Sequence, residues 1–292
     1  MKKVTKAVIL AAGLGTRMLP ATKSVPKELF PIVDKPALQY IVEELVNSGI
    51  KDIMIIISRG KTLIEDHFDK SPELEQKLVA GGEKKKPLLD SVREIANNVN
   101  ILYTRQKEML GTGHALMQAR SFTGDDPFVV CYGDDVIIND EYPVSKQLID
   151  AYNETEKGIV GVQTVTPEQI LMYSTMKVEK IHDNIYSLTD MIEKPKPEQV
   201  FSLFSCLGRM VLPPKIYSLL EKTPFNNGEL MLTDAMKALS NLDGMIAVDF
   251  IGKRYDMGNK LGVMKAQVEM ALKHKDIGPG FREYLKEICN TL

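Results

Sequence analysis

A loop rich in glycine and basic residues follows the first apolar run of the sequence. It reads Ala11-Ala12-Gly13-Leu14-Gly15-Thr16-Arg17, and Pro26-Lys27-Glu28 comes shortly after it. Glycines let backbone N–H groups approach phosphate oxygens, a guanidinium can bind two oxygens at once, and the Lys27 ammonium adds a point charge. We therefore predict that this loop binds a triphosphate.

Two familiar glycine-rich motifs do not fit this loop. A dinucleotide-binding fingerprint needs a third glycine where this chain has Met18, and a P-loop needs Gly-Lys-Ser/Thr, which is absent. Met18 and the lack of an evident hydride-transfer site also count against an NAD(P)-dependent oxidoreductase. An ordinary tight turn would explain Gly13 and Gly15 alone, but it does not explain Arg17 and the proline-framed Lys27 beside them.

Two acidic segments are candidates for binding a metal ion. Asp134-Asp135 follows the apolar run Phe128–Cys131, and Asp256 lies just before a predicted helix. Mg²⁺ prefers oxygen ligands and usually takes only one or two from the protein, the rest coming from phosphates and water. The structural alternatives are a turn at Asp134-Asp135 and a helix N-cap at Asp256.

Two further segments carry groups suited to a base and a sugar phosphate. Gln106 lies shortly before Gly111, and its amide can both donate to and accept from a pyrimidine edge. Glu193-Lys194 ends a predicted strand, where a carboxylate beside an ammonium suits sugar hydroxyls next to a phosphate. Taken alone, Gln106 could be an exposed strand-end residue, and Glu-Lys-Pro is a common strand exit. We interpret His114 as a capping or packing residue.

The elements that position these residues alternate between strand-like and helix-like patterns, which predicts an α/β fold. We expect a Rossmann-like mixed, mainly parallel sheet flanked by helices. The predicted strands are 7–12, 52–58, 101–105, 128–131 and 158–165, followed by a hairpin of 176–181 and 185–192 and by strands 204–212 and 245–250. The predicted helices are 37–48, 61–68, 72–79, 88–97, 114–120, 143–153, 213–221, 230–240, 259–273 and 281–290. Gly49 is expected just past the first helix.

Composition excludes several classes of protein. The chain has 292 residues, 44% hydrophobic and 26% charged, which excludes disordered, collagenous and coiled-coil proteins. A net charge of -2 gives no broad attraction to nucleic acid or anionic lipid. The three cysteines are far apart in sequence, which fits a protein of a reducing compartment better than a disulfide framework. The apolar run 4–14 is too short to span a bilayer. We expect a cytoplasmic protein with nothing removed from its start and with neither nucleic acid nor membrane as a partner.

Over nearly its whole length the chain resembles the bacterial UTP–glucose-1-phosphate uridylyltransferases, within the sugar-1-phosphate nucleotidylyltransferases. The residues from Gly13 to Arg17, continued through Pro26–Pro31, match the family's nucleotidyl-transfer signature. Further matches are Lys35-Pro36, Gln39-Tyr40, Glu43-Glu44, Gln106, Gly111-Thr112-Gly113, Asp134, Glu193-Lys194-Pro195, Gly208-Arg209, Leu232–Ala235 and Asp256.

The resemblance implies that UMP is transferred from UTP to glucose 1-phosphate, giving UDP-glucose and pyrophosphate with Mg²⁺. It implies catalytic roles for Arg17, Lys27 and Lys194, metal binding by Asp134 and Asp256, and sugar-phosphate binding by Glu193 and Lys194. The implied nucleotide contacts come from Ala11, Ala12, Gly13, Gly15, Thr16, Glu28, Gln106 and Gly111. A homodimer or homotetramer is also implied. The alternatives are the same reaction on another sugar 1-phosphate or with dTTP, and a catalytically weak regulator that binds nucleotide sugars.

The departures from the family pattern gather in the second half of the chain. We expect a single domain over 1–292, with a nucleotide-binding half of about 1–165 and a sugar-binding half of about 166–292. Ser174 stands where the family usually has glycine, Leu203 replaces asparagine, Met210 replaces tyrosine and Met231 replaces glutamine. Losing hydroxyl partners weakens discrimination between sugars, so we expect nucleotide choice to be stricter than sugar choice.

Overall fold

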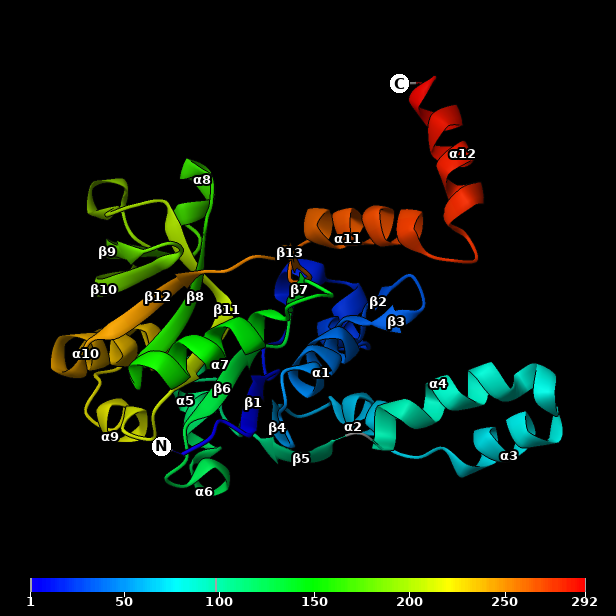
Figure 1. Cartoon of the computed structure of the whole chain (residues 1–292), viewed down its shortest axis with the longest axis horizontal. Helices are drawn as coiled ribbons and strands as arrows, with labels where there is room; N and C mark the ends of the chain where they lie inside the picture. Colours follow the sequence, from blue (N-terminus) through cyan, green and yellow to red (C-terminus); the bar gives the residue numbers. More distant parts are fainter. Residues whose placement is uncertain (1, 98, 292) are drawn as a thin grey trace.

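The computed structural model describes residues 2–97 and 99–291, and its centre is a nine-stranded sheet (Figure 1). The strand order is β5-β4-β1-β6-β11-β8-β12-β10-β9. Strands β5, β4, β1 and β6 are parallel, as are β8 and β12, whereas the remaining neighbours are antiparallel. The strands are β1 (Lys6–Leu10), β4 (Asp52–Ile57), β5 (Asn100–Arg105), β6 (Phe128–Tyr132), β8 (Gly158–Thr164), β9 (Ser174–His182), β10 (Ile185–Glu193), β11 (Phe204–Leu212) and β12 (Met245–Asp249). The predicted mixed α/β sheet is confirmed, and it contains strands from both predicted halves of the chain.

Helices cover both faces of this sheet, because its central strands are apolar on both sides. In β1, Ala7 and Ile9 pack into one hydrophobic cluster and Val8 into the other, and all three are fully buried. One face is covered by α1 (Ala37–Asn47), α2 (Thr62–Phe68) and α7 (Val144–Thr155), and α11 (Lys260–Lys273) extends the same hydrophobic cluster by packing on segments 31–32 and 253–256. The other is covered by α5 (Thr112–Met117), α9 (Ile216–Leu220) and α10 (Leu232–Asp243).

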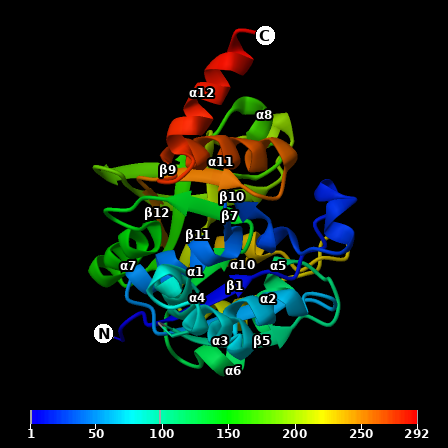
Figure 2. The same cartoon turned by 90° about the vertical axis from the view of Figure 1, so that its right-hand side faces the viewer.

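Two helical segments project from this body (Figures 1 and 2). One is a hairpin of α3 (Pro72–Ala80) and α4 (Lys86–Asn97), and the other is α12 (Gly278–Cys289), which follows α11. Two short helices, α6 (Arg120–Thr123) and α8 (Pro167–Ile170), complete the set. Among residues 2–97 and 99–291, none of the helices combines the length and the apolar character needed to cross a bilayer.

Most predicted elements are present with shifted ends. Gly49 follows α1 with φ +88°, as expected for a glycine that ends a helix. The predicted helix 114–120 is instead two short helices, α5 and α6, and the predicted helix 213–221 shortens to α9.

Two small antiparallel pairs were not predicted: β2 (Pro31–Ile32) with β3 (Lys35–Pro36), and β7 (Asp135–Ile138) with β13 (Lys253–Asp256). These strands are too short to show an alternating pattern, and β7 and β13 are far apart in sequence.

Candidate active site

The candidate site lies where β1, β5 and β6 end. Because these strands are parallel, their carboxyl ends share one edge of the sheet, where open α/β sheets bind ligands. Two adjoining cavities of about 350 and 620 Å³ open here and share Tyr132, Asp134, Glu193 and Lys194, so they form one cleft. The smaller is also lined by Leu10, Ala12, Gly13, Lys27, Gln106, Met109, Gly111, Thr112, Ala115, Glu229 and Met231. The larger is also lined by Thr16, Arg17, Asp135, Leu171, Met172, Tyr173, Ser174, Cys206, Thr233, Arg254 and Asp256.

The glycine-rich loop after β1 folds into three short 3₁₀ turns, at Thr16–Met18, Ala21–Lys23 and Lys27–Leu29. Gly15 adopts φ +67°, a left-handed conformation that favours glycine, and its carbonyl accepts a 2.8 Å hydrogen bond from Thr22 Oγ1. The loop thereby brings Lys27 over Gly13, where a Cβ would lie 3.6 Å from Lys27 Nζ.

Lys27 Nζ forms an ion pair with Asp134 Oδ2 inside the cleft. Burial alone would lower the pKa of Lys27, but the carboxylates of Asp134 and Glu28 outweigh it and raise that pKa. Burial opposes ionisation of Asp134 as well, yet Lys27 and Arg17 lower the pKa of Asp134. Both groups of the pair are therefore charged at neutral pH.

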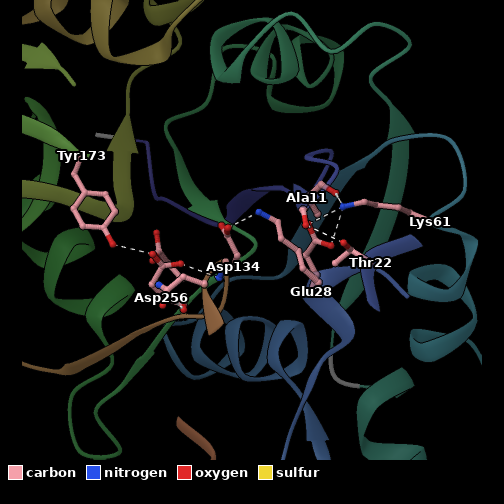
Figure 3. A network of polar contacts seen from close by, with 12 residues as sticks. Ala11, Thr22, Glu28, Lys61, Asp134, Tyr173 and Asp256 are labelled. Carbon is pink, nitrogen blue, oxygen red and sulfur yellow. Dashed lines mark hydrogen bonds and ion pairs between the residues drawn. The ribbon is translucent and has the colours of Figure 1, made fainter. Parts of the chain in front are cut away.

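Glu28 requires a correction, since its expected contact with the nucleotide does not fit its position. The Glu28 carboxylate is fully buried, lines neither cavity and accepts hydrogen bonds of 2.7 and 2.8 Å from Lys61 Nζ. Lys61 also donates to the Ala11 carbonyl at 2.6 Å (Figure 3). It therefore links the start of the glycine-rich loop, at Ala11, to its end, at Glu28. Sequence analysis missed Lys61, which lies 33 residues beyond Glu28.

The pairing of β7 with β13 brings the two predicted metal-binding aspartates together. Asp135 is directly opposite Asp256, and Met257 N donates to the Asp134 carbonyl at 2.8 Å. A Cβ placed on Gly258 would lie 2.6 Å from Asp134 Oδ2, 2.7 Å from Arg17 Nη2 and 3.0 Å from Asp256 Oδ1. Three predicted residues from separate segments thus surround one point, and only glycine leaves room for them. Two carboxylates converging in this way match the oxygen ligands that Mg²⁺ prefers.

A second group of residues, which sequence analysis did not assign, holds Asp256 in place. Gly258 N donates to Asp256 Oδ1 at 2.8 Å, and the Tyr173 hydroxyl donates to Asp256 Oδ2 at 2.8 Å (Figure 3). Arg254 Nε donates to Asp135 Oδ1 at 2.7 Å, and the guanidinium carbon lies 4.8 Å from the centre of the Tyr173 ring. Burial raises the pKa of Tyr173, which keeps its hydroxyl a donor.

Gln106 lines the smaller cavity and is held there by the segment predicted to accompany it. The side chain is buried, and its Nε2 lies 3.1 Å from both the Gly111 carbonyl and His114 Nδ1. Gly111 has φ +93°, and a Cβ there would come within 2.6 Å of the Leu230 carbonyl. The predicted pair of Gln106 and Gly111 is thus adjacent in space, and His114 orients the amide.

Glu193 and Lys194, predicted to bind the sugar phosphate, line both cavities. Thr233 Oγ1 donates to Glu193 Oε2 at 2.8 Å, and burial raises the pKa of Glu193. Lys194 has φ +45°, an unusual conformation for a residue with a side chain, and its N–H donates to the Tyr173 carbonyl at 2.6 Å.

Only two of the four departures in the second half line the cleft. Ser174 lines the larger cavity and Met231 the smaller one. Leu203 lines neither, and Met210 is fully buried in the core on β11. The inclusion of Leu203 and Met210 among the residues that alter the sugar pocket is therefore corrected.

Glu44 and Arg209, which match the family pattern, stabilise the fold. Arg209 is fully buried on β11, and its Nη2 donates to Glu44 Oε2 on α1 at 2.7 Å. Glu44 Oε1 also accepts from the N–H of Ser145, near the start of α7, at 3.0 Å. The pair fixes α1 and α7 to the strand beside β6, which carries Asp134 at its end.

A mixed sheet with a glycine-rich loop, a buried glutamine amide and two converging carboxylates at one edge is typical of nucleotide-binding α/β enzymes. Comparisons with known proteins agree, since the family model described as nucleotidyl transferase matches residues 6–273. The UTP–glucose-1-phosphate uridylyltransferase YngB of Bacillus subtilis is 46% identical over 98% of this chain and 96% of its own length. UTP–glucose-1-phosphate uridylyltransferase 2 of Staphylococcus saprophyticus is 45% identical over 99% of both chains.

Solved structures give the same result. A UTP-bound UGPase from Acinetobacter baumannii has a TM-score of 0.89 and 35% identity, covering 97% of this chain and 99% of its own. A UDP-glucose pyrophosphorylase complexed with UDP-glucose has a TM-score of 0.85 and 36% identity, covering 93% of this chain and all of its own. The chain therefore belongs to the nucleotidyl transferase family and, within it, to the UTP–glucose-1-phosphate uridylyltransferases.

Proposed function

We propose that this chain transfers UMP from UTP to glucose 1-phosphate, producing UDP-glucose and pyrophosphate. The observation that carries the proposal is the single cleft whose lining includes Gln106, Lys27, Asp134, Glu193 and Lys194. The relatives named above carry this activity in their names, and the UTP-bound and UDP-glucose-bound neighbours share the fold.

The donor nucleotide fits the side of the cleft formed by β1 and β5. Gln106 and Gly111 would bind the uracil edge, because the glutamine amide is held beside the glycine backbone. The backbone of Ala12, Gly13 and Thr16, which line the cleft, would approach the phosphates, with Arg17 and Lys27 beside them. Ala11 lines neither cavity, and its N–H donates to the Ile56 carbonyl at 2.8 Å.

The reaction needs positioning and charge neutralisation and no covalent enzyme intermediate. Lys194 would orient the phosphate of glucose 1-phosphate for in-line attack on the α-phosphorus of UTP, while Glu193 accepts hydrogen bonds from sugar hydroxyls. Arg17 and Lys27 would neutralise the charge that develops on the leaving pyrophosphate. All four side chains line the one cleft, which supports this division of roles.

We further propose that Asp134 and Asp256 bind Mg²⁺. When bound, the ion would neutralise phosphate charge at the reacting centre. Lys27 keeps Asp134 ionised, and Gly258 N together with the Tyr173 hydroxyl orients Asp256, so both carboxylates are ready to accept a cation.

The test is a pyrophosphate-release assay with Mg²⁺ over a matrix of nucleotides and sugar 1-phosphates. We expect the highest kcat/KM for UTP with glucose 1-phosphate. A higher value for dTTP or for another sugar 1-phosphate would replace the proposed substrate. UDP-glucose binding without pyrophosphate release in any combination would indicate a regulator.

The same proposal includes a homodimer or homotetramer that works in the cytoplasm. Helix α12 projects from the body (Figure 1), and we expect the interface between subunits at this end of the molecule. The three cysteines are free thiols, consistent with a reducing compartment. Light scattering during gel filtration would give the mass, and a single 32.7 kDa species would contradict the oligomer.

A further inference from the structure

Tyr173 contacts both the proposed metal site and the proposed acceptor-phosphate site. It lies between α8 and β9 and lines the larger cavity. Its hydroxyl donates to Asp256 Oδ2 at 2.8 Å, and its carbonyl accepts from Lys194 N at 2.6 Å. Figure 3 shows the ring pointing toward Asp256. One residue therefore touches two groups that the proposed reaction must align.

The direction of the Tyr173 hydroxyl is set by Arg254. Arg254 Nη1 lies 3.4 Å from the hydroxyl oxygen, and the guanidinium has donors only, so the tyrosine proton is left for Asp256. Arg254 is in turn held by Asp135 through its Nε. The hydroxyl and Gly258 N then bind opposite oxygens of Asp256, which fixes the rotation of this carboxylate.

The carbonyl of Tyr173 supports an unusual backbone at Lys194. Ser174 pairs with Glu193 at the end of the β9–β10 ladder, and the bond from Lys194 N to the Tyr173 carbonyl extends that ladder by one step. Lys194 has φ +45°, a conformation that persists in a residue with a side chain only when its surroundings hold it.

We propose that Tyr173 is a positioning residue that couples the orientation of Asp256 to the placement of Lys194, so that the metal site and the acceptor-phosphate site form together. This inference rests on the proposed function. In this structure Arg254 Nη2 lies 3.9 Å from Asp256 Oδ2. Without the tyrosine hydroxyl, Asp256 Oδ2 is free to move closer to Arg254, and that ion pair competes with a metal ion for the same oxygen.

The test is Tyr173→Phe, with Tyr142→Phe as the matched control. Tyr142 is exposed, and its hydroxyl also donates to an aspartate, Asp150 Oδ2, at 2.7 Å, away from the cleft. Titration with Mn²⁺ alone, followed by electron paramagnetic resonance of the free ion, measures metal affinity without turnover. We expect the Mn²⁺ Kd to rise about tenfold in Tyr173→Phe and to stay unchanged in Tyr142→Phe, with both variants keeping the wild-type Tm.

Kinetics test the coupling itself. In the wild type we expect the KM for glucose 1-phosphate to fall as Mg²⁺ rises, because coupling between two sites is reciprocal. In Tyr173→Phe this dependence should largely disappear, while kcat at saturating Mg²⁺ is mostly retained. In an Asp256→Asn background, Tyr173→Phe should have no additional effect on Mn²⁺ affinity.

Two results would overturn the inference: an unchanged Mn²⁺ Kd in Tyr173→Phe, or an equal loss of affinity with and without Asp256. A wild-type enzyme that releases no pyrophosphate from UTP and glucose 1-phosphate would instead refute the proposed function. The Mn²⁺ titration uses neither substrate, so the two failures are distinguishable.

Discussion

The two sides of the cleft are built differently, although they share one sheet. On the proposed donor side, two residues of the glycine-rich loop form ion pairs with other segments: Lys27 with Asp134, and Glu28 with Lys61. These pairs lie at the ends of strands inside the parallel part of the sheet. On the proposed acceptor side, Glu193 and Lys194 end a hairpin, where the Glu193 carboxylate accepts from Thr233 Oγ1 and Lys194 N donates to the Tyr173 carbonyl.

This difference indicates which side is rigid. Ion pairs between distant segments constrain the proposed donor loop, and we expect such preorganisation to favour transition-state stabilisation. The two bonds named on the proposed acceptor side join no pair of opposite charges, so they constrain that side less than the ion pairs constrain the loop. We therefore expect strict nucleotide selection beside more adaptable sugar selection, and the following predictions test this contrast.

The largest effect is expected from the two aspartates of the proposed metal site. Asp134→Asn and Asp256→Asn each remove an anionic ligand without changing side-chain volume, so we expect kcat/KM to fall by about a thousandfold in each variant. Asp126→Asn is the control, since Asp126 forms ion pairs only with Lys2 and Lys6 among the described residues. Steady-state kinetics over a range of Mg²⁺ concentrations provide the measurement. Wild-type Mg²⁺-dependent rates in both variants would refute the metal assignment.

The next effect concerns the buried pair beneath the phosphate loop. Lys61→Met leaves the Glu28 carboxylate buried without its partner, and we expect the free energy of unfolding to drop by about 3 kcal/mol. Changing both residues, Lys61→Met with Glu28→Leu, should recover most of that loss. Lys215→Met breaks an exposed pair with Asp243 and should cost less than about 0.5 kcal/mol. Urea denaturation measures all three. Equal losses in Lys61→Met and Lys215→Met would show that the buried pair does not support the loop.

The third prediction separates binding from catalysis on the donor side. Lys27→Ala should lower kcat by about a hundredfold and weaken UTP binding much less, because charge develops on the leaving pyrophosphate. Lys23→Ala removes an exposed lysine of the same loop and serves as the control. Calorimetric titration with UTP, set beside steady-state kinetics, distinguishes the two roles. Lost UTP affinity with unchanged kcat would show that Lys27 only binds the nucleotide.

These expectations show what sequence could and could not predict here. The strands carrying the site were predictable because β1, β4 and β6 are continuous apolar runs, and the residues at their ends followed from the motifs. The proximity of Asp134 to Asp256 was not predictable, because it depends on the pairing of the four-residue strands β7 and β13.

Long-range partners were missed for a related reason. Lys61 and Arg254 carry no local pattern, and only the fold brings them to Glu28 and Asp135. The motif predicts that Glu28 contacts the nucleotide, because Glu28 adjoins Lys27 in the sequence. Its side chain points the other way, since successive residues of a tight turn face different directions.

The smallest effect is expected at the acceptor side, where Met231 stands in place of the glutamine usual in the family. Met231 precedes α10 and lines the cleft with Glu193 and Lys194. In the wild type we expect less discrimination between glucose and galactose 1-phosphates than between UTP and dTTP. Met231→Gln adds an amide that can bind a sugar hydroxyl, so kcat/KM for glucose 1-phosphate should rise about fivefold.

The matched control for Met231→Gln is Met210→Tyr, which also restores a residue usual in the family. Met210 is fully buried in the core, so this change should overpack β11 and lower Tm without altering the ratio of glucose to galactose 1-phosphate. The ratios of kcat/KM for both sugar phosphates and for UTP against dTTP are measured in each variant. Because Met231 shares its cavity with Gln106, an altered UTP preference with an unchanged sugar ratio would place Met231 on the donor side. Residue 231 would then contribute to nucleotide selection and not to sugar selection.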